Sequence, residues 1–511
     1  MVRVSVQTAS FRTCTSLFLL LIFCEVGWGQ ANTPAGLAAT VFAIGDVHGD
    51  FDDFGTILER TGLIDAQRHW TGGKGTLVQT GDLLDRGPKS REAIDLMMSL
   101  EKEAARTGGQ VVALLGNHEA MNIMGDLRYV THTEFASFAD AESDKLRKAA
   151  YHKYDSWLKN HAQLLAEITP SVMPKTEAEW MAGHPRGYLE QREAFSPSGS
   201  YGKWLREHSA AAIIDGVIFL HGGISPDIAK IRLDQINSRI SGEIKSFDQE
   251  KQYLEDQKII LSFFSLQEIT AVVQAEIAAE RKSQLRVNTH RQRRLLDFLG
   301  YGKWLSVRPD GPLWFRGYDQ WTDAKGNSQV DKILKAYGAD HIAVGHTVQK
   351  GGRIRSRFDG KVFLIDTGML KSRYPGGRAS ALEIRDTNKF FAQYTDQQNV
   401  QLEAFKTSKY QYQHTQPKAG KECDFTRPCR HIPREAMLCL DQTSLSRQPG
   451  SETDRGLQRA IRAPGTIRTS PSKVPGATQS IAVALRGEPS AKLWTSARRT
   501  SLLCLSRRYR R

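Results

Sequence analysis

Hydrophobic and polar positions change their spacing in blocks between about residues 40 and 400. Short apolar runs of strand length, such as "VFAI" at 41–44, alternate with stretches in which apolar residues recur every three or four positions. The first pattern is typical of buried strands and the second of amphipathic helices. Their alternation predicts an α/β domain over residues 40–400.

Two segments of this domain show mainly the helical pattern. We interpret residues near 133–205 and 227–308 as helical insertions, and the second of these contains no proline. Apolar positions recur there at helical spacing, as in "EIKSFDQEKQYLEDQKIILSFF". The sequence leaves open whether the insertions shape the mouth of a site or serve only as scaffold.

The N-terminal segment differs from this body. Arg3 and Arg12 precede an apolar run at 17–24, and small residues follow it, so residues 1–29 are typical of a signal peptide. A bilayer span needs about 20 apolar residues, and no segment provides them, so we expect no transmembrane anchor. The expected location is the secretory pathway, either secreted or lumenal, or an organelle reached through that pathway.

Residues 415–511 form a basic tail without sustained periodicity, which predicts disorder. The chain has a net charge of +14, and 416–511 hold 19 Lys/Arg against 7 Asp/Glu, which leaves +2 for the rest. The body therefore gives no reason to expect a nucleic-acid partner. It also has no cysteine between 25 and 422, which excludes disulfides, thiolate metal sites and a cysteine nucleophile there.

Five predicted strands end on glycine and on residues that can bind a metal. The endings are GDVHG at 45–49, GDLLDRG at 81–87, GNHE at 116–119, HGG at 221–223 and GH at 345–346. One such turn is common, but five together bring a set of ligands to the edge where α/β folds build their sites. The set is Asp46, His48, Asp82, Asn117, His221 and His346. Carboxylate, amide and imidazole donors without sulfur suit Mn, Fe or Zn.

In this order the motifs resemble those of the metal-dependent phosphoesterases, and within them the phosphoprotein phosphatase family. "GNHEAMNIMGDLRYV", "GPLWFRGY" and "FLIDTGM" are most similar to its Shewanella-like branch, and the resemblance covers roughly residues 40–390. It implies the calcineurin-like metallophosphoesterase fold, a two-sheet β-sandwich flanked by helices. It also implies a metal-dependent phosphatase.

Position by position, the resemblance implies a pair of metal ions. The ligands of the first metal would be Asp46, His48, Asp82 and His346. The second metal would share Asp82 with the first and would also be bound by Asn117 and His221.

The resemblance also implies the residues that act on the substrate. His118 would be the general acid, and Asp85 would hold its ring. Arg86 and Arg316, with Asn117, would bind the phosphate.

These groups suit the hydrolysis of a phosphate monoester, whose negative charge repels nucleophiles. Metals ionise water and grip phosphoryl oxygens, arginine adds bidentate contacts, and a general acid protonates the leaving group. The predicted activity is a protein phosphatase for phosphoserine/threonine, phosphotyrosine or both, acting by direct attack of a metal-bridging hydroxide. A dinucleoside polyphosphate hydrolase and a catalytically inactive binding module are the alternatives. The complete set of ligands, together with His118 and Arg86, argues against the inactive module.

The preferred leaving group depends on side chains around the site, because the motifs grip only the phosphoryl group. The aromatic candidates for its mouth are Tyr129, Phe263, Phe264, Trp314 and Tyr318. Beside the motifs, Glu119 is as readily a structural partner as a site residue, and Asp366 is expected to close a turn. We expect a phosphorylated protein or peptide as the partner, while the sequence does not determine the oligomeric state.

Truncation after residue 415 should leave the turnover of small phosphate esters nearly unchanged, because the removed segment contains none of the motifs. The measurement is kcat/KM on p-nitrophenyl phosphate for the full and the truncated chain, with circular dichroism as the control for folding. A large drop in a truncated chain that still folds would show that the tail contributes to the enzyme.

Overall fold

The computed structural model describes residues 40–165, 172–174, 176–282 and 289–404 of the chain. The predicted signal peptide at 1–29 and the predicted tail at 415–511 lie outside these residues. Export and tail disorder therefore stay predictions.

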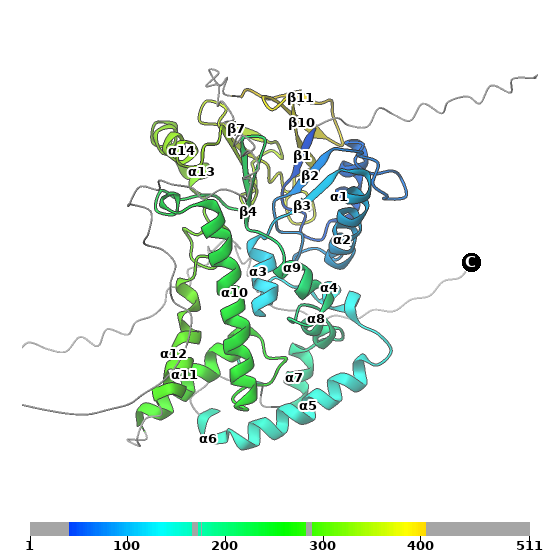
Figure 1. Ribbon diagram of the computed structural model, residues 1–511. Coiled ribbons are helices and arrows are strands. Elements are labelled where there is room, and N and C mark those ends of the chain that lie inside the picture. The colour runs from blue at the N-terminus through cyan, green and yellow to red at the C-terminus, as the bar shows by residue number, and fades with distance from the viewer. Residues whose placement is uncertain (1–39, 166–171, 175, 283–288, 405–511) are drawn as a thin grey trace, which may run out of the picture. The chain divides into compact units, whose positions relative to one another are not determined.

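Two β-sheets face each other in the described part of the chain (Figure 1). The first has the order β11-β10-β9-β1-β2-β3 and the second the order β4-β5-β6-β8-β7. The strands of the first sheet are β1 Val41–Ile44, β2 Thr76–Gln79, β3 Gln110–Ala113, β9 Ser380–Arg385, β10 Lys389–Tyr394 and β11 Val400–Gln401. Those of the second are β4 Ala211–Ile214, β5 Val217–Leu220, β6 His341–Val344, β7 Arg355–Arg357 and β8 Val362–Leu364.

Strand β1 shows why the central strands are apolar at every position. Val41 and Ala43 belong to an apolar cluster that joins both sheets, and it includes Phe219 of the second sheet. Phe42 and Ile44 point to the other face and belong to a cluster shared with the covering helices. Both faces of the strand are buried, so the period-2 alternation of a half-exposed strand is absent. The predicted α/β sandwich flanked by helices is confirmed.

Helices cover the outer faces of the sandwich. Beside the first sheet lie α1 Phe51–Arg60 and α2 Ser90–Thr107, and beside the second α13 Gly317–Gln320 and α14 Asp323–Tyr337 (Figure 1). Asp50 caps the start of α1, and its carboxylate accepts the N–H of Asp53 at 3.2 Å. Gly108 follows the end of α2, and its φ of 78° lies in the left-handed region that favours glycine.

The two segments predicted as insertions are helical and pack on each other below the sandwich (Figure 1). Helix α3 Asn117–Met124 precedes the first of these segments. That segment contains α4 His132–Phe138, α5 Ser143–Asn160, α6 Ala162–Leu165, α7 Glu177–Gly183, α8 Tyr188–Ala194 and α9 Ser200–Arg206. The second contains η1 Ile228–Lys230, α10 Leu233–Asp256, α11 Leu266–Lys282, α12 Thr289–Leu299 and η2 Gly300–Lys303. Together these helices have an apolar core of their own, built around Trp157, Trp180 and Phe264.

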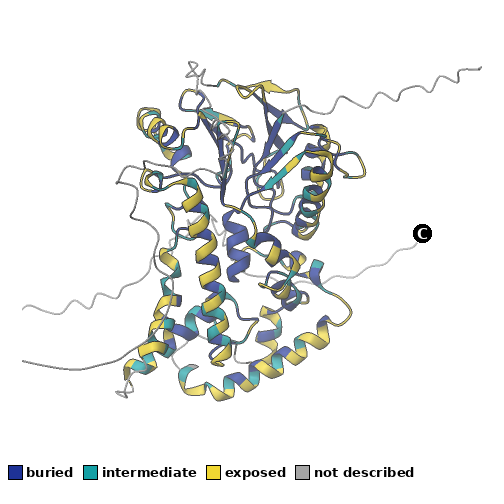
Figure 2. Ribbon diagram, viewed as in Figure 1, coloured by how far each residue is buried: buried dark blue, intermediate teal, exposed yellow. Residues whose placement is uncertain are grey.

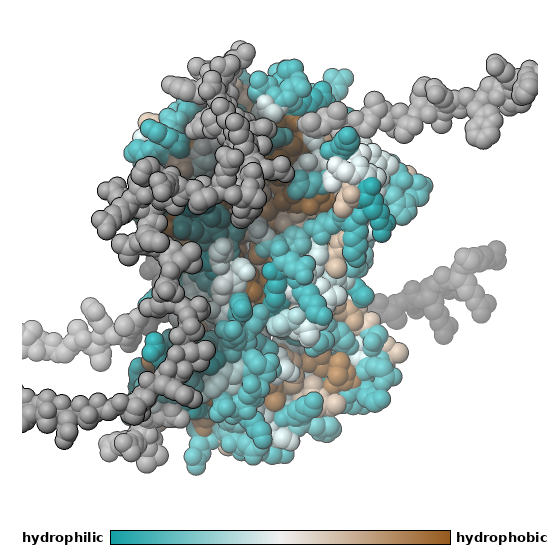
Figure 3. All heavy atoms as spheres, in the orientation of Figure 1, coloured by the Kyte–Doolittle hydropathy of each residue, from teal (hydrophilic) through white to brown (hydrophobic). Residues whose placement is uncertain are grey.

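Helix α3 lies between the sandwich and this helical layer, and all eight of its residues are buried (Figure 2). The face of the helical layer seen in Figure 3 is mostly hydrophilic, with apolar side chains gathered in small areas. None of the helices in the described ranges combines the length and apolar character needed to cross a bilayer.

Candidate metal and phosphate site

Parallel strand pairing brings the predicted ligands to one edge of the sandwich. Strands β1, β2 and β3 run parallel, as do β5, β6 and β8. The ligands follow the carboxyl ends of these strands, where side chains of neighbouring parallel strands meet. They are Asp46 after β1, Asp82 after β2, Asn117 after β3, His221 after β5 and His346 after β6. All five are buried.

Two of the motif glycines are required, because a neighbouring carboxylate occupies the space that a side chain at the glycine position would fill. A Cβ atom on Gly116 would lie 2.3 Å from Asp82 Oδ1, and one on Gly345 would lie 2.4 Å from Asp46 Oδ1. These distances are far below van der Waals contact. The glycines before Asn117 and His346 thus let the aspartates reach the centre of the site.

Several site residues have left-handed backbone conformations. The φ angles are 51° for His48, 60° for Asp82, 69° for Asp85, 71° for Arg86 and 66° for His346. Such φ values cost a non-glycine residue on the order of 1–3 kcal/mol and persist only where surrounding contacts enforce them. Their clustering indicates that the required positions of these side chains, rather than the conformational preference of the backbone, determine the local structure.

Three histidines have one ring nitrogen fixed by the backbone. A backbone carbonyl accepts from His48 Nδ1 at 3.0 Å, from His221 Nδ1 at 3.0 Å and from His346 Nε2 at 3.1 Å. In each neutral ring the other nitrogen therefore carries the lone pair, and it faces the centre of the site. This orientation is the one that metal-binding histidines have in proteins.

The second half of the site is a tight group of such donors. His221 Nε2 lies 2.8 Å from Asn117 Oδ1, 3.2 Å from Asp82 Oδ2 and 3.1 Å from His346 Nδ1. His346 was predicted as a ligand of the first metal. Its backbone N–H donates to Asp46 Oδ1, another predicted ligand of that metal, at 2.8 Å. The structure places its free nitrogen beside His221, so its assignment to the first metal stays a prediction.

The first half is centred on His48. Its Nε2 lies 3.6 Å from Asp46 Oδ2 and 3.7 Å from Asp82 Oδ2. Arg86 Nη1 donates to this nitrogen at 2.6 Å. Because the guanidinium is a cation, its approach shows that the lone pair of His48 faces a place where positive charge is favoured.

Asp82 belongs to both halves and remains ionised. Burial alone would raise the pKa of Asp82, but the imidazoles of His221 and His118 hold it well below its usual value. Burial favours the neutral ring of His221, yet the carboxylates of Asp82 and Asp46 raise its pKa to about 9. The site therefore attracts cations, and its oxygen and nitrogen donors fit hard or borderline metal ions. Two groups of these side chains could hold a metal, and Asp82 belongs to both.

His118 stands beside the metal donors, held by a carboxylate. Its Nδ1 donates to Asp85 Oδ2 at 2.5 Å, and both residues are fully buried. Its Nε2 lies 3.8 Å from Asp82 Oδ2 and accepts from Arg86 Nη2 at 2.9 Å. Asp85 thus fixes one nitrogen of the ring, and the other is directed into the site toward Arg86.

The two predicted phosphate-binding arginines lie on different sides of the site. Arg86 is flanked by Tyr374, whose hydroxyl accepts from Nη1 at 2.5 Å, and by the ring of Tyr129 at 5.3 Å. Arg316 is exposed, and its Nη1 donates to the backbone carbonyl of His346 at 3.0 Å. The structure thus brings Arg316 to the rim, despite the long insertion that precedes it.

Glu119 and Asp366 have structural contacts. Glu119 accepts the backbone N–H groups of Asp82 at 2.7 Å, Leu83 at 2.9 Å and Gly116 at 2.8 Å, which ties the β2 turn to the start of α3. Asp366 accepts the N–H of Gly368 at 3.0 Å and so closes the expected turn. Its side chain also lies against Asp46.

Three of the aromatic residues predicted for the mouth are core residues instead. Phe263 and Phe264 belong to the apolar core of the helical layer, and Tyr318 is buried with its hydroxyl bonded to the carbonyl of Ile224 at 3.1 Å. The prediction was wrong for Phe263 and Phe264 because the helical layer needs large side chains for its own core. It was wrong for Tyr318 because this ring belongs to the core between the sheets and their covering helices. Tyr129 and Trp314 do lie at the site, with rings 5.0 Å from that of His118 and 6.0 Å from that of His346.

Sequence reasoning missed three residues that contact the site or its supports, namely Asn122, Gln191 and Tyr374. Tyr374 lies 288 positions from its partner Arg86, and Gln191 lies 69 positions from Asn122. Asn122 follows GNHE by three positions, but nothing in that spacing marks it. Contacts across such separations depend on packing, which a short motif does not record.

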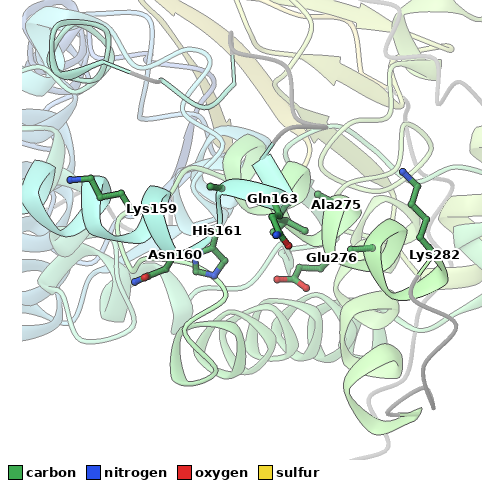
Figure 4. A pocket seen from close by; sticks show the side chains of 10 residues that line it. Lys159, Asn160, His161, Gln163, Ala275, Glu276 and Lys282 are labelled. Carbon is green, nitrogen blue, oxygen red and sulfur yellow. The ribbon is translucent and has the colours of Figure 1, made fainter.

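A separate cavity of about 770 Å³ lies between the end of α5, helix α6 and helix α11 (Figure 4). Its charged lining residues are Lys159, Glu276 and Lys282. None of the predicted site residues lines it, so it adds no ligand or acid to the site above.

The site agrees with the sequence comparisons. Residues 39–350 match the family described as calcineurin-like phosphoesterases. The chain belongs to this family. The predicted metal-dependent phosphoesterase is thereby confirmed, with the motif residues gathered at one buried site. The identity of the metals and the individual roles of the residues stay predictions.

Relatives of this phosphoesterase include two named as protein phosphatases. Shewanella-like protein phosphatase 2 of Arabidopsis thaliana is 33% identical over 211 residues, which are 40% of this chain and 51% of the relative. Shewanella-like protein phosphatase 1 of Plasmodium berghei is 24% identical over 350 residues, or 68% and 72% of the two chains. A solved cold-active protein-tyrosine phosphatase of a psychrophilic Shewanella species is 25% identical with a TM-score of 0.45, covering 71% of this chain and 80% of that one.

His118→Asn should retain the metals and phosphate binding but lower turnover of alkyl phosphates by about 10²–10⁴-fold, the range for a lost general acid. The loss should be smaller for p-nitrophenyl phosphate, because its leaving group scarcely needs a proton. Steady-state kinetics on both substrates measure the difference. Equal losses would remove His118 from this role.

Asp82→Asn should be more damaging, because Asp82 belongs to both halves of the site and an amide lacks its charge. We expect reduced metal content together with activity below that of His118→Asn. Elemental analysis of the purified variant is the measurement. Full occupancy of two metal positions would contradict the bridging assignment.

Proposed function

We propose that this phosphoesterase is a protein phosphatase that hydrolyses phosphate monoesters with a pair of metal ions. The observation that carries the proposal is the position of the His118–Asp85 pair, which lies beside the metal donors and within hydrogen-bond distance of Arg86. The site thus combines a cation-binding centre, a group that can give a proton and a guanidinium. The relatives named as protein phosphatases support a protein substrate.

The arginines are available for the phosphate. Among the described residues, neither Arg86 nor Arg316 forms an ion pair with a carboxylate, although both lie at the site. A phosphate dianion can therefore accept hydrogen bonds from them without breaking an existing ion pair. Arg86 would turn from the two imidazoles toward the phosphoryl oxygens.

Metals bound at this site would activate water and neutralise charge on the phosphoryl group. The chain itself supplies the proton for the leaving group. Asp85 holds the Nδ1 proton of His118 and stabilises the protonated ring, so Nε2 is the atom that donates to the departing oxygen. Asn117 would bind a metal through Oδ1, while its amide nitrogen donates to Met121 Sδ at 3.9 Å.

The experiment that tests the proposal compares substrates after metal removal and reconstitution. Chelated enzyme should be inactive, and Mn, Fe or Zn should restore hydrolysis of phosphopeptides. Diadenosine tetraphosphate is the competing substrate, since dinucleoside polyphosphate hydrolases share most of these motifs. A higher kcat/KM on the dinucleotide than on every phosphopeptide of a panel would overturn the protein-phosphatase proposal.

Phosphotyrosine peptides should be hydrolysed at least as well as matched phosphoserine peptides. The reason is that Tyr129 and Trp314 place aromatic rings beside His118 and His346, where a flat leaving group can pack. A phenol also leaves with less help from an acid. The measurement is kcat/KM on a matched peptide panel. A tenfold preference for phosphoserine or phosphothreonine, about 1.4 kcal/mol, would contradict this expectation.

A further inference from the structure

A chain of buried hydrogen bonds continues behind the His118–Asp85 pair. The second oxygen of Asp85 accepts from Asn122 Nδ2 at 2.9 Å. The same amide nitrogen donates to the backbone carbonyl of His118 at 3.0 Å. The amide oxygen of Asn122 accepts from Gln191 Nε2 at 2.7 Å. Asn122 and Gln191 are both fully buried.

This chain crosses from the sandwich side of the site to the helical layer. Asn122 belongs to α3, one turn after His118, whereas Gln191 belongs to α8. Helix α8 is held against α3 by Arg192, whose Nη1 donates to the backbone carbonyl of Asn122 at 2.9 Å. It is held to the rest of the layer by Tyr188, whose hydroxyl donates to the carbonyl of Phe263 at 3.2 Å.

The direction of the Asn122 amide follows from its partners. Asp85 and the His118 carbonyl are both acceptors, so they require the NH₂ end, while Gln191 presents a donor to the oxygen end. The reverse orientation would set the amide oxygen against a carboxylate and a carbonyl, and two N–H groups against each other. In a buried site, opposed polar groups are expensive, so the carboxylate of Asp85 and the carbonyl of His118 fix the direction of the Asn122 amide.

Hydrogen bonds hold the backbone N–H of Asp85 and both of its carboxylate oxygens. Its backbone N–H donates to Ser90 Oγ at 3.0 Å, one carboxylate oxygen accepts from His118 and the other from Asn122. Among the described residues, Asn122 is the side chain that holds the carboxylate oxygen not bonded to His118. Gln191 donates to the other end of the Asn122 amide and so adds a third contact that holds this orientation.

We propose that Asn122 and Gln191 are positioning residues for proton donation by His118. They act through Asp85, and Gln191 makes the helical insertion part of the catalytic apparatus. This inference rests on the proposed function, in which His118 is the general acid. Neither residue contacts the substrate, so their effect should appear in turnover that needs the acid and not in substrate binding.

The decisive variant is Gln191→Met, which keeps the length of the side chain and removes its donor. We expect kcat on a phosphoserine peptide to fall about tenfold, less than the 10²–10⁴-fold of a lost acid. The loss on p-nitrophenyl phosphate should stay below about twofold, with KM unchanged on both. Asn122→Ala should show the same selectivity with a larger loss on the peptide.

Tyr188→Phe is the matched control. It removes one buried hydrogen bond from the same helix, α8, without touching the network. Its kcat should fall equally, or not at all, on the two substrates, while its melting temperature should drop at least as much as that of Gln191→Met. This comparison separates loss of stability from loss of positioning.

Equal losses of Gln191→Met on both substrates, or a profile like that of Tyr188→Phe, would overturn the inference. The proposed function fails in a different way. Equal losses for His118→Asn would remove the general acid itself. A selective loss for His118→Asn, without one for Gln191→Met and Asn122→Ala, would overturn the positioning role alone.

Discussion

The structure depends on holding two carboxylates, Asp46 and Asp82, ionised and buried in one place. Like charges at short range repel strongly where water is excluded, so the arrangement is stable only with compensating cations and donors around it. The protein supplies imidazoles, backbone N–H groups and the Arg86 guanidinium. Glycines that admit the carboxylates and left-handed residues that aim the side chains follow from the same requirement.

Helix α3 connects the buried carboxylates to the rest of the molecule. Its first turn supplies Asn117 and His118, and the His118 N–H donates to Asp82 Oδ1 at 3.0 Å. Its second turn supplies Asn122, which meets α8, and Met124 belongs to the core of the helical layer. One helix buried on all sides thus connects the charged edge of the sandwich with a layer that has its own apolar core.

The fold could be predicted, and so could the meeting of the candidate ligands at one edge, because the motifs that carry them are local in sequence. A strand that ends on Gly-Asp or Gly-His carries its donor at a fixed place, and parallel pairing brings such ends together. The direction of Phe263 or Tyr318 could not be predicted, since apolar character does not say which core a ring joins. The contact of Gln191 could not be predicted either, because its partner is the Asn122 amide on another helix.

The candidate ligands come from both sheets, with Asp46, Asp82 and Asn117 following strands of the first and His221 and His346 following strands of the second. A cation held between them would be a non-covalent cross-link across the sandwich. Because an unfolded chain offers no such arrangement, binding energy at this site is also folding energy. Metal supply would then govern how long the protein survives as well as how fast it works.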